Sequence, residues 1–577
     1  MTSTEPDAAE QLRRAKSLQS VLEPAVDALF RPWKRPANFY LALEEKLANS
    51  TVATGEGPYM NDKEEANTLK DLGPVLQEMC NDYIYLEASP LPDVRQYLVE
   101  QVGKCARKDA EKYWKKYRGP ELEPPLKSGA IALVDAHWLV SLAARGGKIT
   151  YRQDAPPEAF ISLDDLKLQG KGHYGLRIIV ISYPWLQPDH PDPHGKHLSR
   201  VARVLRAFIE DLPGGKWAVL WDFMSLHQHP NFAGGVMRTP EQTSLFKEAL
   251  SSLGDFYAHQ FIPALMLTKL PAGYPNGYTL PPAARLRAEK GAAAEYFNRG
   301  WCFTESSLCA MTKDYDFVFD LGKLSDEMIR SGMGHEDIRK VCAAEGARPP
   351  PRLPPLFDQM VSQKSFTNGK DDMPIVKKVQ RSAFTHEFEK VHVLNFCRLD
   401  WGDDEATAIA DIVTQYASAA GNLTDLRLHF NHVGDAGAAA LAECLVTVPS
   451  LKELRLNGNK IGGAGAAALA DALGRRKCTI ESLGLGGNPL GDDGVIAICE
   501  AVVASAATLK VFIVDKCGLT DAAVPALCAA LKVIGPTVAM LNLVNDGFTD
   551  AGRAKLQAAE PRLGTKNFTL VKEAKGH

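Results

Sequence analysis

A glutamate stands beside a tryptophan and a cysteine in the stretch RGWCFTE, residues 299–305. If a helix begins near Trp301, then Trp301, Leu308 and Cys309 share the helical face of Glu305, because residues three and four apart lie on one side of a helix. Glu305 would then face apolar neighbours, where a carboxylate has to be hydrogen-bonded, paired or lining a cleft. Such surroundings tune the pKa of a catalytic acid, so Glu305 is the first catalytic candidate.

Two other interpretations of this stretch stay open. A glutamate in the first turn of a helix is favoured by the helix dipole, and Arg299 or His227 could neutralise it in a purely structural role. Cys302 would lie at a helix N-terminus, which lowers the pKa of a thiol, but no residue stands out as its base.

Histidines gather in two loops upstream of this stretch and offer a rival, metal-based chemistry. Their spacing, DHPDPHGKH in the first loop, matches no established zinc motif, and proline-rich loops commonly hold polar side chains in solvent. We therefore expect no metal site. The ligands that this rival would use are Asp189, His190, Asp192, His194, His197, His227 and His229.

The elements that must position Glu305 alternate between strand and helix. Continuous apolar runs are typical of strands buried on both faces of a parallel sheet, and amphipathic stretches follow them. This alternation predicts a doubly wound parallel α/β sheet. The expected strands are residues 176–182, 217–222, 261–267 and 315–319, and the expected helices are 198–212, 241–260 and one from residue 301.

Three long loops leave the expected carboxyl ends of these strands, at residues 183–197, 223–240 and 268–300. Ligands of such sheets bind outside the strand ends, and loops of this length are more often functional than not. We expect the loops to meet at one edge of the sheet, beside Glu305.

Three motifs in this segment carry a family resemblance. IIVISYPW at 178–185, WAVLWDFMSL at 217–226 and RGWCFTES at 299–306 resemble the first strand, the second strand and the Trp-Cys-x-x-Glu helix start of Toll/interleukin-1 receptor (TIR) domains. The match is also close to TIR-like modules of algae and protists and to fungal heterokaryon-incompatibility (HET) domains. GGKITYRQDAPPEAF at 146–160 is similar to a lead-in of those modules.

The resemblance implies cleavage of the nicotinamide–ribose bond of NAD+ as a substrate, with no resident cofactor. Glu305 falls on the family's catalytic glutamate and would stabilise an oxocarbenium-like transition state. Tyr183 and Trp185 would offer aromatic surface to a ring of the substrate, and Arg299 would meet a phosphate. Many other TIR domains only self-associate. The remaining substrate-binding candidates are Asp222, Ser225 and Trp301.

The last third of the chain repeats one template of a strand followed by a helix. The strand-like strings are centred on five apolar residues at spacings of 28, 29, 29 and 29, and a degenerate copy starts near Val391. The pattern resembles leucine-rich repeats of the ribonuclease-inhibitor type, in which stacked units share one core. About six units are expected over residues 386–570. The five central residues are Leu426, Leu454, Leu483, Phe512 and Leu541.

Two kinds of position recur in the template, and each suggests a role for its side chains. An asparagine three residues after the strand string can satisfy backbone groups where the chain turns away, as at Asn431, Asn459 and Asn488. Strand side chains that point outward would bind a protein partner on the concave face. These partner-binding candidates are Arg427, His429, Arg455, Asn457 and Asp515.

The other segments carry less chemistry. Residues 1–120 have helical periodicity, residues 121–330 form the expected TIR-like domain, and residues 331–385 have the composition of a proline-rich linker. PPPRLPP at 349–355 is typical of a spacer, with a polyproline II ligand of an SH3-like partner as the alternative.

Composition excludes several functional classes. A net charge of -4 gives no electrostatic reason to expect a nucleic acid or an anionic membrane as partner. No run of 18 apolar residues exists, so no membrane span is expected. Eleven scattered cysteines without a CxxC pair indicate reduced thiols and a cytoplasmic location.

These observations predict an intracellular immune-type or stress-type signalling protein. Its repeats would recognise a protein partner, and its TIR-like domain would signal by self-association or by NAD+ hydrolysis. The alternative is a non-enzymatic scaffold that acts through self-association and protein binding. A metal-dependent hydrolase built on the histidine loops is the third hypothesis.

Overall fold

A computed structural model describes most of the chain from residue 110 onward. The greater part of the helical region expected over 1–120 therefore lies outside the described residues. The described ranges are 110–168, 175–212, 216–229, 237–280, 282–289, 295–343, 348–366, 369–417, 421–475, 480–505, 508–544, 547–565 and 567–570.

The first part of the described chain is built on a six-stranded sheet in the order β2-β1-β4-β3-β5-β6. The four strands from β3 to β6 run parallel, whereas β1 is antiparallel to both β4 and β2. Their bounds are β1 (Leu133–Asp135), β2 (Phe160–Ile161), β3 (Ile178–Ser182), β4 (Ala218–Leu220), β5 (Ala264–Met266) and β6 (Val318–Asp320).

Helices cover both faces of this sheet because successive strand residues point to opposite sides. Ile178 and Val180 pack into the core beneath α10, α12 and α16. Ile179 and Ile181 pack on the other face, against α6, α8 and α14. The bounds are α6 (Ala136–Ala144), α8 (Lys196–Asp211), α10 (Pro240–Tyr257), α12 (Gly300–Cys309), α14 (His335–Cys342) and α16 (Gly369–Lys390).

The expected strands appear as β3, β4, β5 and β6, each shorter than its apolar run, and the expected helices appear as α8, α10 and α12. The expectation of a wholly parallel sheet is wrong at one edge, where β1 and β2 are antiparallel. Strands of two or three residues are too short for their alternation to be recognised in a sequence. Shorter helices complete this part: α5 (Glu123–Lys127), α7 (Leu163–Lys167), α9 (Asp222–Ser225), α11 (Pro282–Glu289) and α13 (Asp326–Arg330).

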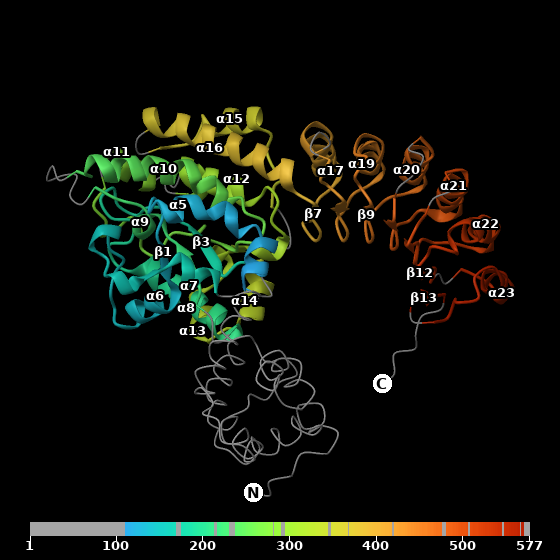
Figure 1. Cartoon of the computed structure of the whole chain (residues 1–577), viewed down its shortest axis with the longest axis horizontal. Coiled ribbons are helices and arrows are strands. Elements are labelled where there is room, and N and C mark those ends of the chain that lie inside the picture. Colours follow the sequence, from blue (N-terminus) through green and yellow to red (C-terminus); the bar gives the residue numbers. More distant parts are fainter. Residues whose placement is uncertain are drawn as a thin grey trace, which may run out of the picture.

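The segment 331–385 differs from the expected linker, because it contains α14, α15 (Pro354–Val361) and most of α16. Figure 1 shows α15 and α16 lying over α10 and α12, on the α/β part of the molecule. Pro354 is buried and opens α15, since proline suits the first helical turn. Phe357 stacks on Phe303 of α12. The proline-rich stretch is thus packed into the domain and is not a free spacer.

The second part is a solenoid of seven parallel strands in the order β13-β12-β11-β10-β9-β8-β7. The strands line one side of the solenoid, and the helices lie on the opposite side (Figure 1). The central residues of the template are in register from strand to strand, as Leu454 beside Leu426 and Leu483 illustrates. The strands are β7 (Val393–Asn395), β8 (Asp425–Arg427), β9 (Glu453–Arg455), β10 (Ser482–Gly484), β11 (Val511–Ile513), β12 (Met540–Asn542) and β13 (Phe568–Thr569). The helices are α17 (Asp403–Ile412), α19 (Asp435–Thr447), α20 (Gly463–Arg475), α21 (Gly491–Ala504), α22 (Val524–Ile534) and α23 (Asp550–Ala559).

The two parts share a continuous apolar core. The helix α16 leads directly into β7, and buried polar contacts cross the junction. The indole Nε1 of Trp401 donates to the carbonyl of Arg348 at 2.7 Å, and the Nε2 of Gln260 donates to the carbonyl of Val393 at 2.9 Å. A buried apolar junction that is also crossed by hydrogen bonds favours a fixed arrangement of the α/β part and the solenoid.

Candidate functional site

Glu305 lies on α12 at the carboxyl end of the parallel strands. Its side chain packs toward the sheet, as the helical spacing predicts, and the residue is 8% exposed. The hydroxyl of Ser182, the last residue of β3, donates to Oε2 of Glu305 at 2.5 Å. Ser182 also contacts the hydroxyl of Tyr296, which precedes α12. The glutamate is therefore tied to the edge at which ligands of α/β sheets bind.

Burial raises the pKa of Glu305 well above its ordinary value, and the nearby Asp222 raises it further. The hydrogen bond from Ser182 acts in the opposite direction but does not outweigh these two effects. Ser182 is the only described residue that hydrogen-bonds to this carboxyl group. Burial thus favours the neutral acid over the carboxylate, and a cation placed beside Glu305 would favour the ionised form.

Asp222 follows β4, and its carboxyl group accepts hydrogen bonds from three donors. The hydroxyl of Tyr183 donates to it at 2.6 Å, the indole of Trp185 at 3.1 Å, and the backbone N–H of Phe223 at 2.6 Å. Burial nevertheless keeps the pKa of Asp222 above its ordinary value. The predicted residues Tyr183, Trp185 and Asp222 therefore form one cluster that joins the loops after β3 and β4.

The aromatic members of this cluster differ in how much surface they offer. Tyr183 is buried, and its ring packs edge-on against Trp221 and His197 as part of the core. Trp185 is half-buried and packs edge-on against Phe223. Trp185 is thus the better placed of the two for contact with a ring of a ligand.

Arg299 and Cys302 fasten the loop after β3 to the start of α12. Arg299 donates from Nη1 to the carbonyl of Trp185 at 2.6 Å, and the Cys302 thiol donates to the carbonyl of Tyr183 at 3.4 Å. Burial raises the pKa of Cys302 well above its ordinary value, with Glu305 adding to the shift. A thiol held neutral in this way is a poor nucleophile, so the geometry disfavours the cysteine-based chemistry.

Two of the predicted substrate-binding residues make contacts of another kind. The hydroxyl of Ser225 is buried and accepts from the backbone N–H of Trp221 at 3.0 Å, which closes the turn of α9. The indole of Trp301 donates to Asp372 on α16 at 3.1 Å. Although helical spacing puts Trp301 near the face of Glu305, the indole N–H of Trp301 links α12 to α16 and does not point to the Glu305 group.

The three histidines of the first loop contact separate backbone carbonyls, whereas His229 of the second loop contacts the guanidinium of Arg238 at 2.9 Å. His190 contacts the carbonyl of Ile149 at 3.1 Å, and His197 contacts that of Pro184 at 3.1 Å. His194 contacts the carbonyl of Gly277 at 3.2 Å. Within the described ranges these histidines do not gather with other possible ligands into a group of three.

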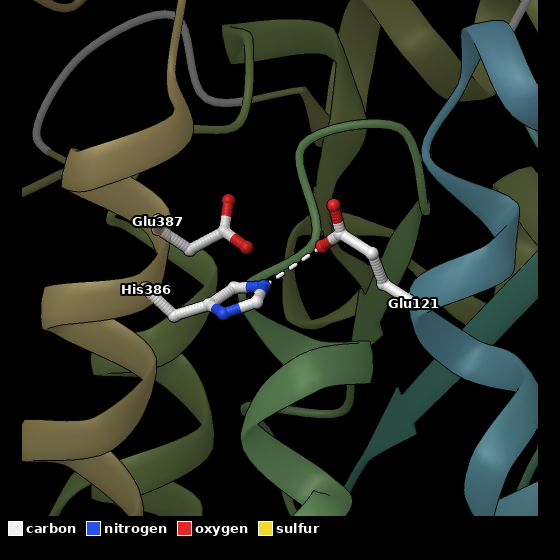
Figure 2. A group of neighbouring side chains, drawn as sticks. All are labelled: Glu121, His386 and Glu387. Carbon is white, nitrogen blue, oxygen red and sulfur yellow. Dashed lines mark hydrogen bonds and ion pairs between the residues drawn. The ribbon is translucent and has the colours of Figure 1, made fainter. Parts of the chain in front are cut away.

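A polar cluster that sequence reasoning missed joins the segment before α5 to α16. Figure 2 shows Glu121 facing His386 and Glu387, with the imidazole Nε2 of His386 at 2.8 Å from Glu121. Arg118 donates to both oxygens of Glu387, at 2.8 and 2.7 Å, and to both oxygens of Glu121, at 3.2 and 2.8 Å. Lys390 lies 3.3 Å from Glu121.

The charges of this cluster compensate one another. Burial alone would raise the pKa of Glu121, but hydrogen bonds from His386 and Arg118 outweigh it and hold that pKa far below its ordinary value. Because a guanidinium already occupies both carboxylates, the cluster is an ionic clasp between two chain segments and has no need of a metal cation. Glu121 and His386 are 265 positions apart, and no local pattern links them.

The predicted partner-binding residues of the repeats lie on neighbouring strands. Arg427 on β8 pairs with Asp425 at 2.8 Å and with Glu453 on β9 at 2.6 Å. Arg455 contacts the same Glu453 at 2.9 Å. These four side chains form a connected row of alternating charge on the strand face.

The other predicted residues of the strand face extend this row. His429 has its pKa lowered to about 4 by burial and by the nearby Arg455 and Arg427, so its ring is neutral at neutral pH. Asn457 accepts from the backbone N–H of Gly486 at 3.0 Å. Asp515 has its pKa raised by burial. The strand face thus combines charged, neutral and amide groups across β8 to β11.

Comparison with known families supports the repeats. A family model described as Leucine Rich repeat matches residues 422–442, 449–470 and 476–499. No curated protein matches the chain. Residues 422–499 are therefore leucine-rich repeats, a class of unit that recognises proteins. No helix among the described residues has the length and the apolar content that crossing a membrane requires.

Proposed function

We propose that this chain is a signalling scaffold whose leucine-rich repeats bind a protein partner through the strand face. The observation that carries the proposal is the row from Asp425 and Arg427 on β8 to Glu453 and Arg455 on β9. Side chains two apart on a strand project from one face, so these groups are presented together to a partner. A fixed array of both charges favours a complementary partner and rejects others.

The α/β part would be the signalling half of the scaffold, acting through self-association as the TIR-like interpretation implies. The apolar core that it shares with the repeats supports this division, because a partner held on the solenoid would be held in a fixed position relative to the domain. A cytoplasmic location belongs to the same proposal. It is supported by eight free cysteines in the described ranges, seven of them buried.

A photocrosslinking experiment tests where the partner binds. A photoreactive amino acid is placed at His429 on the strand face or at Ala467 on the exposed side of α20. The proposal expects one protein to be captured from the strand-face position and not from the helix position. Equal capture from both positions would contradict it.

NAD+ cleavage is the second candidate function, and one observation favours it. Asp222 follows β4, and Glu305 is hydrogen-bonded to the last residue of the neighbouring β3. In the sheet, β4 lies on one side of β3 and β5 on the other, so the chain changes direction across the sheet at β3. Ligands of α/β sheets bind at such a switch point. The positive charge of the nicotinamide ring would lower the pKa of Glu305 and yield the carboxylate that stabilises an oxocarbenium-like transition state.

The catalytic candidate is tested by incubating the full-length protein at high concentration with NAD+ and measuring the release of nicotinamide. Glu305→Gln is expected to abolish the release, while Glu443→Gln, which changes an exposed carboxylate on α19, leaves it intact. Release by Glu305→Gln at the wild-type rate would exclude Glu305 from the chemistry.

A further inference from the structure

A hollow of about 400 Å³ lies on the face of the α/β part opposite to α12, between α8 and the pair α13–α14. Its volume falls within the range of about 300–1,000 Å³ that is usual for small-molecule sites. It is separate from the Glu305 group, because α12 covers the other face of the sheet. The residues that line it are Arg203, Val204, Arg206, Ala207, Glu210, Leu324, Ile329, Gly332, Met333 and Ile338.

The floor and the far wall of this hollow are apolar. Val204 and Ala207 lie one turn apart on α8 and are buried, as is Ile338 on α14. Ile329 and Met333 form the far wall and remain partly exposed. The open apolar surface of the hollow is therefore that of Ile329 and Met333, and an apolar group that covers it would be stabilised there.

Three arginines follow one another at intervals of three along α8, and they differ in what they do. Arg200 donates to the carbonyls of Leu321 and Leu324, at 2.8 and 2.9 Å, and pairs with Asp326 at 2.8 Å. It thereby fixes the segment that leads into α13. Arg200 is thus a structural residue that holds one wall of the hollow in place.

Arg203 and Arg206 are exposed at the rim of the hollow. Neither hydrogen-bonds to or pairs with any residue in the described part of the chain. Like charges three positions apart on a helix repel each other, so an anion between them would remove an unfavourable interaction. Glu210 stands one turn further along α8 and would keep a second anionic group away from that end.

We propose that this hollow binds a soluble amphiphile with one anionic head group and an alkyl body, of the fatty-acid type. The head group would accept charge-assisted hydrogen bonds from Arg203 and Arg206. The alkyl chain would lie against Ile329 and Met333. The positive charge of the two arginines at the rim favours an anionic head group over a cationic one. The volume of the hollow suits an alkyl chain of medium length.

Calorimetric titration of the full-length protein tests the site with decanoate, hexanoate and decylamine. Each buried methylene strengthens binding about fourfold, so decanoate is expected to bind on the order of a hundredfold more tightly than hexanoate. Decylamine has the same chain with a cationic head, and it is expected not to bind. Equal binding of decanoate and decylamine, or no binding of decanoate, would overturn the proposal.

Matched variants locate the binding. Arg203→Gln and Arg206→Gln are each expected to weaken decanoate binding about tenfold, since each removes a charged donor. Arg381→Gln, on the exposed side of α16, is the control and should change nothing. Ile329→Glu places a like charge on the partly exposed wall and should also weaken binding, with thermal denaturation confirming that each variant is folded.

Two further results would also count against the site. The first is sedimentation of the protein with vesicles of anionic lipid when decanoate does not bind, because the face would then be a membrane-binding surface. The second is binding of an acidic amphipathic peptide in place of decanoate, which would identify a docking surface for a protein.

Discussion

The hydroxyl of Ser182 donates a hydrogen bond of 2.5 Å to Oε2 of Glu305, and so links the last residue of β3 to α12. This contact brings together two segments that are 123 positions apart. It holds a carboxyl group where burial and Asp222 raise its pKa. The neutral form of the glutamate is therefore favoured in the folded protein relative to the unfolded chain, and this has a measurable consequence for stability.

Glu305→Gln is expected to make stability less dependent on pH. The pKa of Glu305 in the folded state is above its ordinary value of 4.5, which approximates that of the unfolded chain. As pH rises above 4.5, the unfolded chain loses this proton before the folded protein does, so the wild type loses stability up to the folded-state pKa. Glutamine has no such proton and can still accept from Ser182.

Chemical denaturation at pH 4 and pH 8 measures the effect. The variant is expected to match the wild type near pH 4 and to have the higher denaturation midpoint at pH 8. A pH-independent difference between the two proteins would show that Glu305 titrates normally in the folded state.

Arg118→Gln is expected to destabilise the protein by about 3 kcal/mol, because it leaves a buried carboxylate without its cation. The side chain of Glu387 is only 2% exposed and receives two hydrogen bonds from Arg118. Adding Glu387→Gln should restore part of the loss, since the uncompensated charge is then removed. Urea denaturation measures each step.

Arg475→Gln is the matched control for the clasp. Arg475 also pairs with two carboxylates, but its partners Glu443 on α19 and Asp471 on α20 are both exposed. Pairs in solvent contribute little, so the denaturation midpoint should hardly move. If both arginine variants lost the same stability, burial of Glu387 would not be the cause.

Asn459→Ala is expected to destabilise the repeats by about 3 kcal/mol. The amide nitrogen of Asn459 donates to the carbonyls of Leu428 and Leu456, both at 2.9 Å, and its oxygen accepts from the backbone N–H of Val433 at 3.0 Å. All three backbone groups are buried, and three hydrogen bonds are lost. The N–H of Val433 loses its acceptor, whereas the carbonyls of Leu428 and Leu456 each keep a second donor, from Asn431 and Asn488. Asn457→Ala, two positions earlier on the strand face, removes one bond to Gly486 and should cost about 1 kcal/mol.

Much of this fold is legible in the sequence where a pattern is long or repeated. The near-constant spacing of Leu426, Leu454 and Leu483 predicts the solenoid, and the structure pairs these residues in register. The buried run around Ile178–Ser182 predicts β3, because an uninterrupted apolar run is typical of a strand covered on both faces. The template asparagines bind backbone groups as their position predicts.

The remainder depends on contacts between distant segments. The proline-dense stretch before α15 has the composition of a linker, and only the packing of Phe357 and Val361 on α12 shows that it belongs to the domain. The clasp of Arg118 with Glu387 spans 269 positions, so no window of sequence reveals it. For the candidate site, helical spacing predicts that Glu305 faces the sheet. It does not predict the hydrogen bond of Trp301 to Asp372 on α16, because that contact joins distant segments.

The most direct test of the account compares two arginines on opposite sides of the solenoid. Arg455 lies on the strand face of β9, and Arg475 lies at the end of α20; their side chains are 39% and 44% exposed, and both pair with carboxylates. The measurement is the affinity of the partner captured at His429 for Arg455→Ser and for Arg475→Ser. The account predicts at least about a tenfold loss for Arg455→Ser and no change for Arg475→Ser. Unchanged affinity in Arg455→Ser, or equal losses in both variants, would contradict recognition through the strand face.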